Sequence, residues 1–313
     1  MNPAHKRRGS GWLAAGTVLL LSACTPTSPP APTVTRVAAQ NLPDFGHVHD
    51  VQVDPADHTV LIATHTGVWT MPDPFEEDPG QLERAGEGRQ DTMGMTVTVD
   101  GALYASGHPA PGEQTDLKTP NLGLIRSTDG ATTWDQVSLT GEVDFHALST
   151  ATTDTGAERV VGLDSATSRL LISNDSGASW TPGATVEARD VHVMRADPDT
   201  IVATTPTGLQ LSRDTGQTFT LDRDAPTLVL VDAGLGGTLV GIDPQGAVWT
   251  GSPGGTDWTE HGTAPSGTQA MTYVPDDSPG NQPWILLATN TGLFTSRDLG
   301  ASWDPVLGRQ ETG

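Results

Sequence analysis

The sequence predicts an all-β protein, folded as a single six-bladed β-propeller. A turn motif that closes with an aromatic residue recurs along the chain, and these aromatic residues lie 39 to 46 residues apart. Between the motifs are apolar runs of four to six residues, broken by Gly, Pro and Asp, which are typical of antiparallel strands. A period near 40 residues with short strands indicates a propeller or a β-solenoid, and no stretch has the pattern of a long amphipathic helix.

The recurring motif begins with Ser-x-Asp, contains Gly and ends with Trp or Phe. Its four copies are 127–134 (STDGATTW), 173–180 (SNDSGASW), 212–219 (SRDTGQTF) and 296–303 (SRDLGASW), and a fifth stretch, 251–258 (GSPGGTDW), lacks the Asp at that place. Glycine permits the positive φ of a tight turn, and Asp accepts backbone N–H bonds across it. The aromatic residue packs between sheets. We therefore predict a structural role, without catalysis, for Asp129, Asp175, Asp214 and Asp298.

These motifs resemble the Asp-box, or BNR, repeat of sialidase-like propellers, and the resemblance covers about residues 45–307. The chain is similar to exported Asp-box lipoproteins that are labelled glycosyl hydrolases or sialidase-like proteins, with which it shares the segments HVHD, DTMGM and SGHP. In such proteins the Asp box is a hairpin turn remote from the active face. The resemblance therefore implies a propeller whose working face is the opposite mouth, and a glycosyl hydrolase label.

The strand patterns divide residues 45–309 into six units. Their approximate bounds are 45–88, 89–139, 140–184, 185–223, 224–262 and 263–309, and the first unit lacks the turn motif. Each unit has room for four short strands, so each is predicted to be one blade. The sequence does not decide whether 33–37 (TVTRV) adds a closing strand.

The N-terminal segment predicts export and a lipid anchor. Three basic residues precede a short apolar run and the stretch LSAC, as in a signal peptide over residues 1–23. LSAC resembles the bacterial lipobox, which implies that Cys24 carries the lipid and that the protein is anchored to the outer face of the bacterial cell membrane. Residues 24–44 are rich in Pro and Thr and are predicted to form an extended tether. Because Cys24 is the only cysteine, an intramolecular disulfide is excluded.

The formal net charge of −22 bears on possible partners. Such a charge opposes binding to nucleic acid and to anionic lipid surfaces, and it favours solubility. We expect a monomer that has no nucleic-acid partner. A small molecule, a metal ion or a glycan is the expected ligand.

Histidines gather at one predicted mouth of the propeller. The first strand of each blade lines the central channel, and residues two apart on a strand share a face. Aligning the six first strands gives one ring of His47, Asp91, Asp144, Asp190, Thr227 and Gln269, and a second ring of His49, Met93, His146, His192, Val229 and Met271. The ends of the second strands add His65, His108, Asp164, Asp243 and Asn290. Six of the nine histidines therefore fall on one face.

We predict that this mouth is a ligand-binding pocket, formed mainly by blades one to three. The predicted ligand-binding residues are His47, His49, His65, Asp91, Met93, His108, Asp144, His146, Asp190 and His192.

One hypothesis for this pocket is a transition-metal site. Imidazole binds Zn and Cu well, and a thioether adds a preference for Cu(I). The candidate metal ligands are His47, His49, His65, His146 and Met93, with Cu or Zn as the metal. Asp91 and Asp144 are the residues expected to orient the imidazoles.

A second hypothesis is glycoside hydrolysis, which needs two carboxyl groups facing the scissile bond. The candidate catalytic residues are Asp91, Asp144 and Asp164, and Asp190 and Asp243 are further possible members of a pair. The sequence departs from true sialidases, because Tyr104 and Tyr273 have no evident glutamate partner and Arg189 is the one arginine near the predicted mouth.

A third hypothesis is a surface module that binds a protein or glycan without turnover. It would need exposed aromatic residues at the mouth for sugar stacking. Most tryptophans instead occupy motif or strand positions. This argues against a sugar-stacking surface but not against a polar interface with a protein.

Overall fold

The computed structural model describes residues 45–76, 81–110, 120–275 and 282–308. The signal peptide predicted over 1–23, Cys24, the tether predicted over 24–44 and the segment 33–37 lie outside these residues. Among the residues described, no helix is long and apolar enough to span a membrane.

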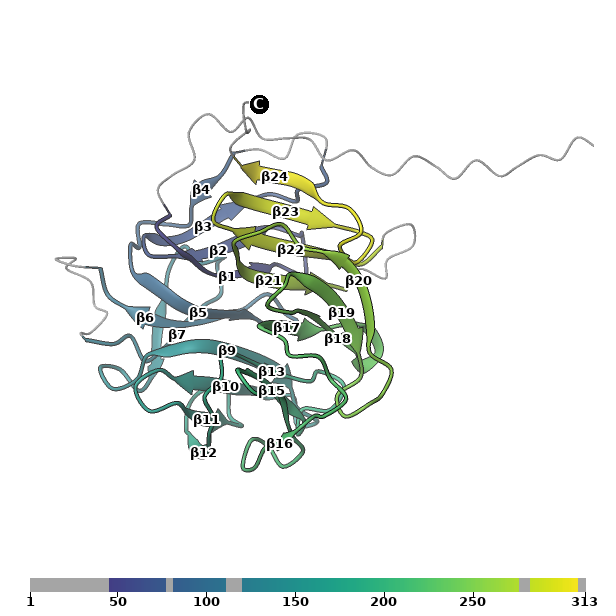
Figure 1. The fold of residues 1–313 in the computed structure, drawn as a ribbon. Helices are drawn as coiled ribbons and strands as arrows, with labels where there is room; N and C mark the ends of the chain where they lie inside the picture. Colours follow the sequence, from purple (N-terminus) through teal and green to yellow (C-terminus); the bar gives the residue numbers. More distant parts are fainter. Residues whose placement is uncertain (1–44, 77–80, 111–119, 276–281, 309–313) are drawn as a thin grey trace, which may run out of the picture. The chain divides into compact units, whose positions relative to one another are not determined.

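Six antiparallel sheets of four strands form the blades of a propeller, in the part of the chain that the structure describes (Figure 1). This confirms the predicted fold class. Blade one contains β1 (Val48–Val53), β2 (Val60–Thr64), β3 (Gly67–Met71) and β4 (Glu83–Arg84); blade two contains β5 (Asp91–Val97), β6 (Leu103–His108), β7 (Leu124–Ser127) and β8 (Asp135–Ser138); blade three contains β9 (Phe145–Thr152), β10 (Glu158–Asp164), β11 (Arg169–Ser173) and β12 (Thr181–Thr185).

The second half of the propeller repeats this arrangement. Blade four contains β13 (Asp190–Val193), β14 (Ile201–Thr205), β15 (Gly208–Ser212) and β16 (Thr220–Leu221); blade five contains β17 (Leu230–Ala233), β18 (Leu239–Ile242), β19 (Ala247–Gly251) and β20 (Thr259–Thr263); blade six contains β21 (Thr268–Val274), β22 (Trp284–Thr289), β23 (Gly292–Ser296) and β24 (Asp304–Gly308). A 3-10 turn at Leu235–Gly237 links β17 to β18.

The first strands of the blades form a closed ring around the axis. Strands β1, β5, β9, β13, β17 and β21 contact one another in this order, and β21 returns to contact β1. Among the described residues, the sheet of blade six consists of β21 to β24. Within the described part of the chain, packing and a hydrogen bond join blades six and one.

Apolar side chains carry most of this closure. Val51 and Ile62 of blade one share a buried cluster with Trp284 and Leu286 of blade six. Phe75 packs edge-on against Trp284 with ring centroids 5.0 Å apart. Further buried clusters lie between or within the other blades, so the core is spread around the ring. Burial of apolar area between sheets is the main stabilising term for such a fold.

A circle of polar bonds supplements the apolar core. At each of the six junctions, a side chain of one blade accepts a hydrogen bond from a backbone N–H in the first strand of the next blade. We call these the junction bonds: Asp50 Oδ2 to Met95 N, Ser106 Oγ to Phe145 N, Ser149 Oγ to Val193 N, Asp190 Oδ2 to Val231 N, Asp232 Oδ2 to Tyr273 N, and Gln269 Oε1 to Val48 N. They fix the position of each first strand along the propeller axis relative to the neighbouring blade. The residues at the mouth are positioned as a result.

The four Ser-x-Asp motifs are tight turns joining the third and fourth strands of their blades. In blade three, Asp175 accepts bonds from the Ser173 hydroxyl and from both the backbone N–H and the hydroxyl of Ser179. The same bonds form around Asp129, Asp214 and Asp298. In blade five, Asp257 closes the turn from a later position by accepting bonds from Ser252. The carboxylates are thus engaged within their own turns.

Candidate functional site

The mouth is shaped by β-bulges in the first strands of four blades. The pairing of β1 with β2, β5 with β6, β9 with β10 and β21 with β22 skips one residue each, at His49, Met93, His146 and Gln269 respectively. A bulge interrupts the two-residue alternation of a strand and re-aims its side chains. In blade one, this places both His49 and the next residue, Asp50, on the lining of the axial cavity.

Blades four and six have no bulge at the position aligned with His49, so their side chains at this position are placed differently. Strand β13 has no bulge, and His192 pairs with Val202 within the regular ladder. His192 is buried, whereas the bulge residue His146 is exposed. In blade six the bulge falls on Gln269, two residues before the position that the alignment places opposite His49.

The first polar group consists of His49, His65 and Asp91, which we call the histidine–aspartate triplet. His49 Nε2 lies 3.3 Å from His65 Nδ1 and 3.4 Å from Asp91 Oδ1, and His65 Nδ1 lies 2.9 Å from the same carboxylate oxygen. The residues come from the bulge of β1, the end of β2 and the start of β5, so the triplet spans the junction between blades one and two. These three side chains have the spacing of a possible metal-ligand set.

The electrostatics of the triplet favour the ionised form of Asp91. Burial by itself raises the pKa of Asp91, but hydrogen bonds from His49 and His65 outweigh it and hold this pKa below its ordinary value. His47 stands beside the triplet, with Nδ1 3.3 Å from His49 Nδ1. Burial and the neighbouring His49 and His65 lower the pKa of His47, so its imidazole is neutral at pH 7.

The second polar group is centred on the buried carboxylate of Asp144. Its Oδ2 lies 2.8 Å from His146 Nε2 and 3.3 Å from His108 Nε2, and it accepts a 3.1 Å bond from the Ser165 hydroxyl. The hydrogen bond with Asp144 raises the pKa of His146. Among the described residues, the triplet has the mutual spacing of a metal-ligand set and this group does not, so it is less suited to chelating an ion.

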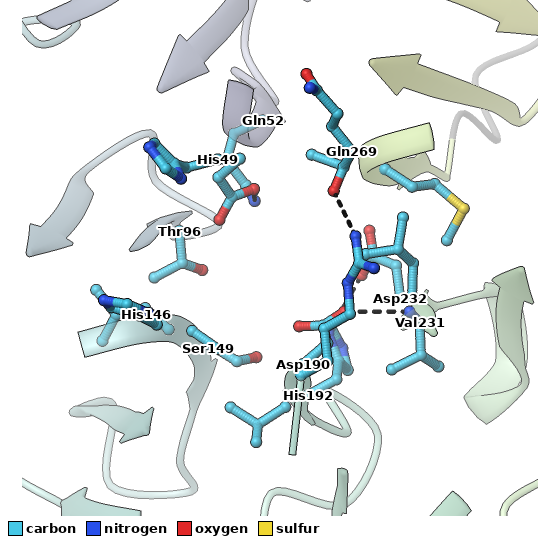
Figure 2. Close-up of a pocket in the computed structure, with 18 of the residues that line it drawn as sticks. His49, Gln52, Thr96, His146, Ser149, Asp190, His192, Val231, Asp232 and Gln269 are labelled. Atoms are coloured by element: carbon cyan, nitrogen blue, oxygen red, sulfur yellow. Dashed lines mark hydrogen bonds and ion pairs between the residues drawn. The ribbon is translucent and has the colours of Figure 1, made fainter. Parts of the chain in front are cut away.

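The third feature is a cavity on the propeller axis, of about 360 Å³. Figure 2 shows its lining, with His49, Thr96 and His146 facing Gln269, Asp232 and Asp190 across the opening. Arg189 and Arg195 also line it. Burial raises the pKa of Asp50 to about 8 and that of Asp190 to about 7. A cavity of this size with converging polar groups is typical of a small-molecule site.

One ring nitrogen of His192 has an interaction partner and the other has none among the described residues. Its Nδ1 lies 3.3 Å from Asp232 Oδ1, while its Nε2 is buried and has no hydrogen-bond partner in the described structure. Burial lowers the pKa of His192, which keeps this ring neutral.

The predicted site residues thus fall into three places. His47, His49, His146, Asp190 and His192 line the axial cavity. His65 and Asp91 stand behind His49, and His108 and Asp144 stand behind His146, so these four belong to the same mouth without lining the cavity.

Two predicted residues are not among these groups. Met93 is half-buried at its bulge and does not line the cavity. Asp164 accepts bonds from Ala166 N and the Thr167 hydroxyl in its own turn, and it too lies off the cavity. Of the candidate catalytic residues Asp91, Asp144 and Asp164, none lines the axial cavity.

Sequence reasoning missed Asp50, Asp232 and Arg195, which line the cavity. Asp50 directly follows His49, and strict alternation would place it on the opposite face of the strand. Asp50 and Asp232 could have been found because each is an acidic residue in a first strand, where a buried carboxyl needs hydrogen-bond partners.

Comparisons with known proteins establish the fold. No protein-family model and no curated protein matches this sequence. Among solved structures, an ancestral GH74 enzyme is similar with a TM-score of 0.53 and 14% identity, over 85% of this chain and 39% of that one. A GH74 enzyme from Niastella koreensis has a TM-score of 0.48 and 18% identity, over 79% of this chain and 42% of that one. YCF48 bound to D1 peptide has a TM-score of 0.45 and 18% identity, over 72% and 71%. The chain spans less than half the length of the GH74 enzymes.

Proposed function

We propose that this protein is a metal-binding propeller that holds Zn²⁺ or Cu²⁺ at the histidine–aspartate triplet. The observation that supports this proposal is the spacing of the three ligand atoms, 2.9, 3.3 and 3.4 Å. For metal–ligand bonds of about 2.0–2.1 Å in a tetrahedron, neighbouring ligand atoms are about 3.3 Å apart. Two imidazole nitrogens and a carboxylate oxygen are a common ligand set for Zn²⁺.

The fourth ligand position would face the mouth. The His65 side chain is 45% exposed whereas that of His49 is 10% exposed, so the triplet is open on the His65 side. His47 contacts the other ring nitrogen of His49, Nδ1, so it would orient this ligand, and water would fill the fourth position. Of the metal ligands considered from the sequence, His146 is engaged with Asp144, and Met93 is half-buried at the bulge of β5.

The test is elemental analysis of the purified protein, followed by calorimetric titration of the metal-free form with Zn²⁺ and with Cu²⁺. One ion per chain is expected, and binding should weaken by at least 100-fold in a His49→Ala, His65→Ala variant. His261→Ala is the matched control, because His261 is exposed on β20 and outside the mouth. Absence of a bound ion together with absence of a thermal shift would refute the proposal, and so would full retention of binding in the double variant.

We further propose that the protein is lipidated at Cys24 and anchored to the outer face of the bacterial cell membrane. The support is the basic and apolar sequence before LSAC. Mass spectrometry of the N-terminal peptide should find a diacylglyceryl adduct on Cys24, and Cys24→Ser should release the protein from membranes. An unmodified Cys24 in membrane-free wild-type protein would overturn the assignment.

Glycoside hydrolysis is the second candidate function. The position of Asp190 in the axial cavity, together with its raised pKa, favours it. This carboxyl lines the axial cavity, and its pKa of about 7 leaves it protonated in part at neutral pH, as a general acid requires. Hydrolysis of a panel of polysaccharides and aryl glycosides should be abolished by Asp190→Asn. Equal turnover by a folded Asp190→Asn variant would remove Asp190 from this role.

A further inference from the structure

The charged groups of the axial cavity differ in how many hydrogen bonds they form with other residues of the protein. Asp50 accepts bonds on both oxygens, from the Gln52 amide and from Met95 N. Asp232 accepts bonds from Tyr273 N and the Thr272 hydroxyl on one oxygen, and it faces His192 with the other. The carboxyls therefore serve to hold neighbouring first strands together.

The arginines of the cavity are engaged far less. Arg189 donates one bond, from Nη2 to the backbone oxygen of Gln269 at 3.2 Å. Arg195 lines the cavity without a hydrogen bond or ion pair to any residue in the described ranges. By contrast, Arg159 is paired with Asp199, and Arg84 stacks on Trp69. A guanidinium offers five donors, so most donors of Arg189 and Arg195 are open to a ligand.

Arg195 also occupies a central place. It lines the axial cavity, a cavity next to β9, and a third cavity at the far ends of β1, β5 and β21. Its side chain thus lies where the axial cavity ends, away from the mouth. Both arginines are exposed, so an oxyanion that enters from the mouth would meet Arg189 beside Gln269 and Arg195 at the opposite end of the cavity. The buried, unpartnered Nε2 of His192 lies in the same lining.

We propose that the axial cavity binds a small organic anion whose carboxylate or phosphate groups pair with Arg189 and Arg195. Paired charges and planar guanidinium groups recognise these oxyanions strongly. The burial that raises the pKa of Asp190 also reduces the negative charge opposite the arginines, which favours an anion. This site is separate from the histidine–aspartate triplet, although His49 borders both. Anion binding should therefore persist in metal-free protein.

The test is calorimetric titration of the metal-free full chain at pH 7 with succinate and, separately, with inorganic phosphate. Wild type should bind at least one of them, and Arg195→Gln and Arg189→Gln should each weaken binding by about tenfold or more, the effect of losing one charged hydrogen bond. Arg213→Gln is the matched control, because Arg213 lies at a turn outside the cavity. Preference for succinate or for phosphate identifies the acidic group of the ligand.

Two results would overturn the proposal. One is that folded wild type binds neither anion at about 10 mM, a concentration at which even weak binding is detected. The other is that wild type and both arginine variants bind equally well. Thermal melting checks that each variant is folded. Zn²⁺ titration of Arg195→Gln separates this site from the metal site. Metal binding without anion binding would overturn the inference alone, and anion binding without metal binding would overturn the proposed function alone.

Discussion

At the scale of single residues, the buried carboxyls of the first strands link the scaffold to the site. Asp190 accepts a junction bond from Val231 N and lines the axial cavity, so one side chain serves both. Its burial, and the proximity of Asp232, raise its pKa to about 7, whereas Arg189 opposes the shift. The native state consequently favours the protonated carboxyl, in an environment that also includes Asp50.

The Asp190 carboxyl makes stability depend on pH. Its folded pKa of about 7 lies above the unfolded value of about 3.9, so its stabilising contribution is complete below pH 4 and is lost as pH rises through 7. Asp190→Asn keeps an acceptor for Val231 N and cannot ionise. Between pH 5 and 8, wild type should lose about 2 kcal/mol of unfolding free energy relative to this variant.

Urea unfolding of both proteins at pH 5, 6, 7 and 8 measures this difference. Asp154→Asn, at an exposed loop position, is the control and should show no such trend. A constant gap between wild type and Asp190→Asn across the range would contradict the pKa shift.

At the scale of elements, the Ser-x-Asp turn is the repeating unit that shapes each outer hairpin. Two consecutive residues have positive φ in these turns, as in Ser176 (59°) and Gly177 (87°). In blade three the glycine is required at the second place, because a Cβ on Gly177 would lie 2.2 Å from Leu124 Cδ2. The turn of blade two has Ala131 at this place, after Gly130. The carboxylate then satisfies the backbone N–H that the turn leaves unpaired. The residue pattern and the turn geometry therefore have one physical cause.

The prediction for this element concerns Asp175. Asp175→Ala removes the acceptor for the Ser179 N–H and hydroxyl, so the Tm should fall, by roughly 2–4 °C in a domain of this size. Asp175→Asn retains an acceptor oxygen and should recover most of the loss. Differential scanning calorimetry measures both variants, and an unchanged Tm in Asp175→Ala would show that the side chain does not stabilise the turn.

At the scale of the whole molecule, stability depends on the contact between the first and last blades. No covalent link joins them among the described residues, and the Gln269–Val48 bond and the Trp284 cluster hold them together. Trp284 is 1% exposed and touches Phe75 from blade one. Because every blade is held by two neighbours, loosening this junction affects both of its blades.

Trp284→Ala should cost about 3–5 kcal/mol of unfolding free energy, as for other large aromatic truncations in cores. Hydrogen exchange should rise in β1 and β2 as well as in β21 and β22. Phe145→Ala is the comparison, because Phe145 is equally buried but its cluster draws on blades two and three. Faster exchange confined to blade six would contradict a shared closing interface.

The sequence by itself determined the all-β class, the propeller repeat and the gathering of polar residues at the starts of the first strands. These features are local, since strand alternation and turn chemistry are written within a few consecutive residues. Only the tertiary structure decided how those residues group. The bulges at His49 and His146 re-aim side chains, and the junction bonds draw Asp50, Asp190 and Asp232 to the axis. Bulges and inter-blade register depend on packing between strands about 40 residues apart, which no single strand encodes.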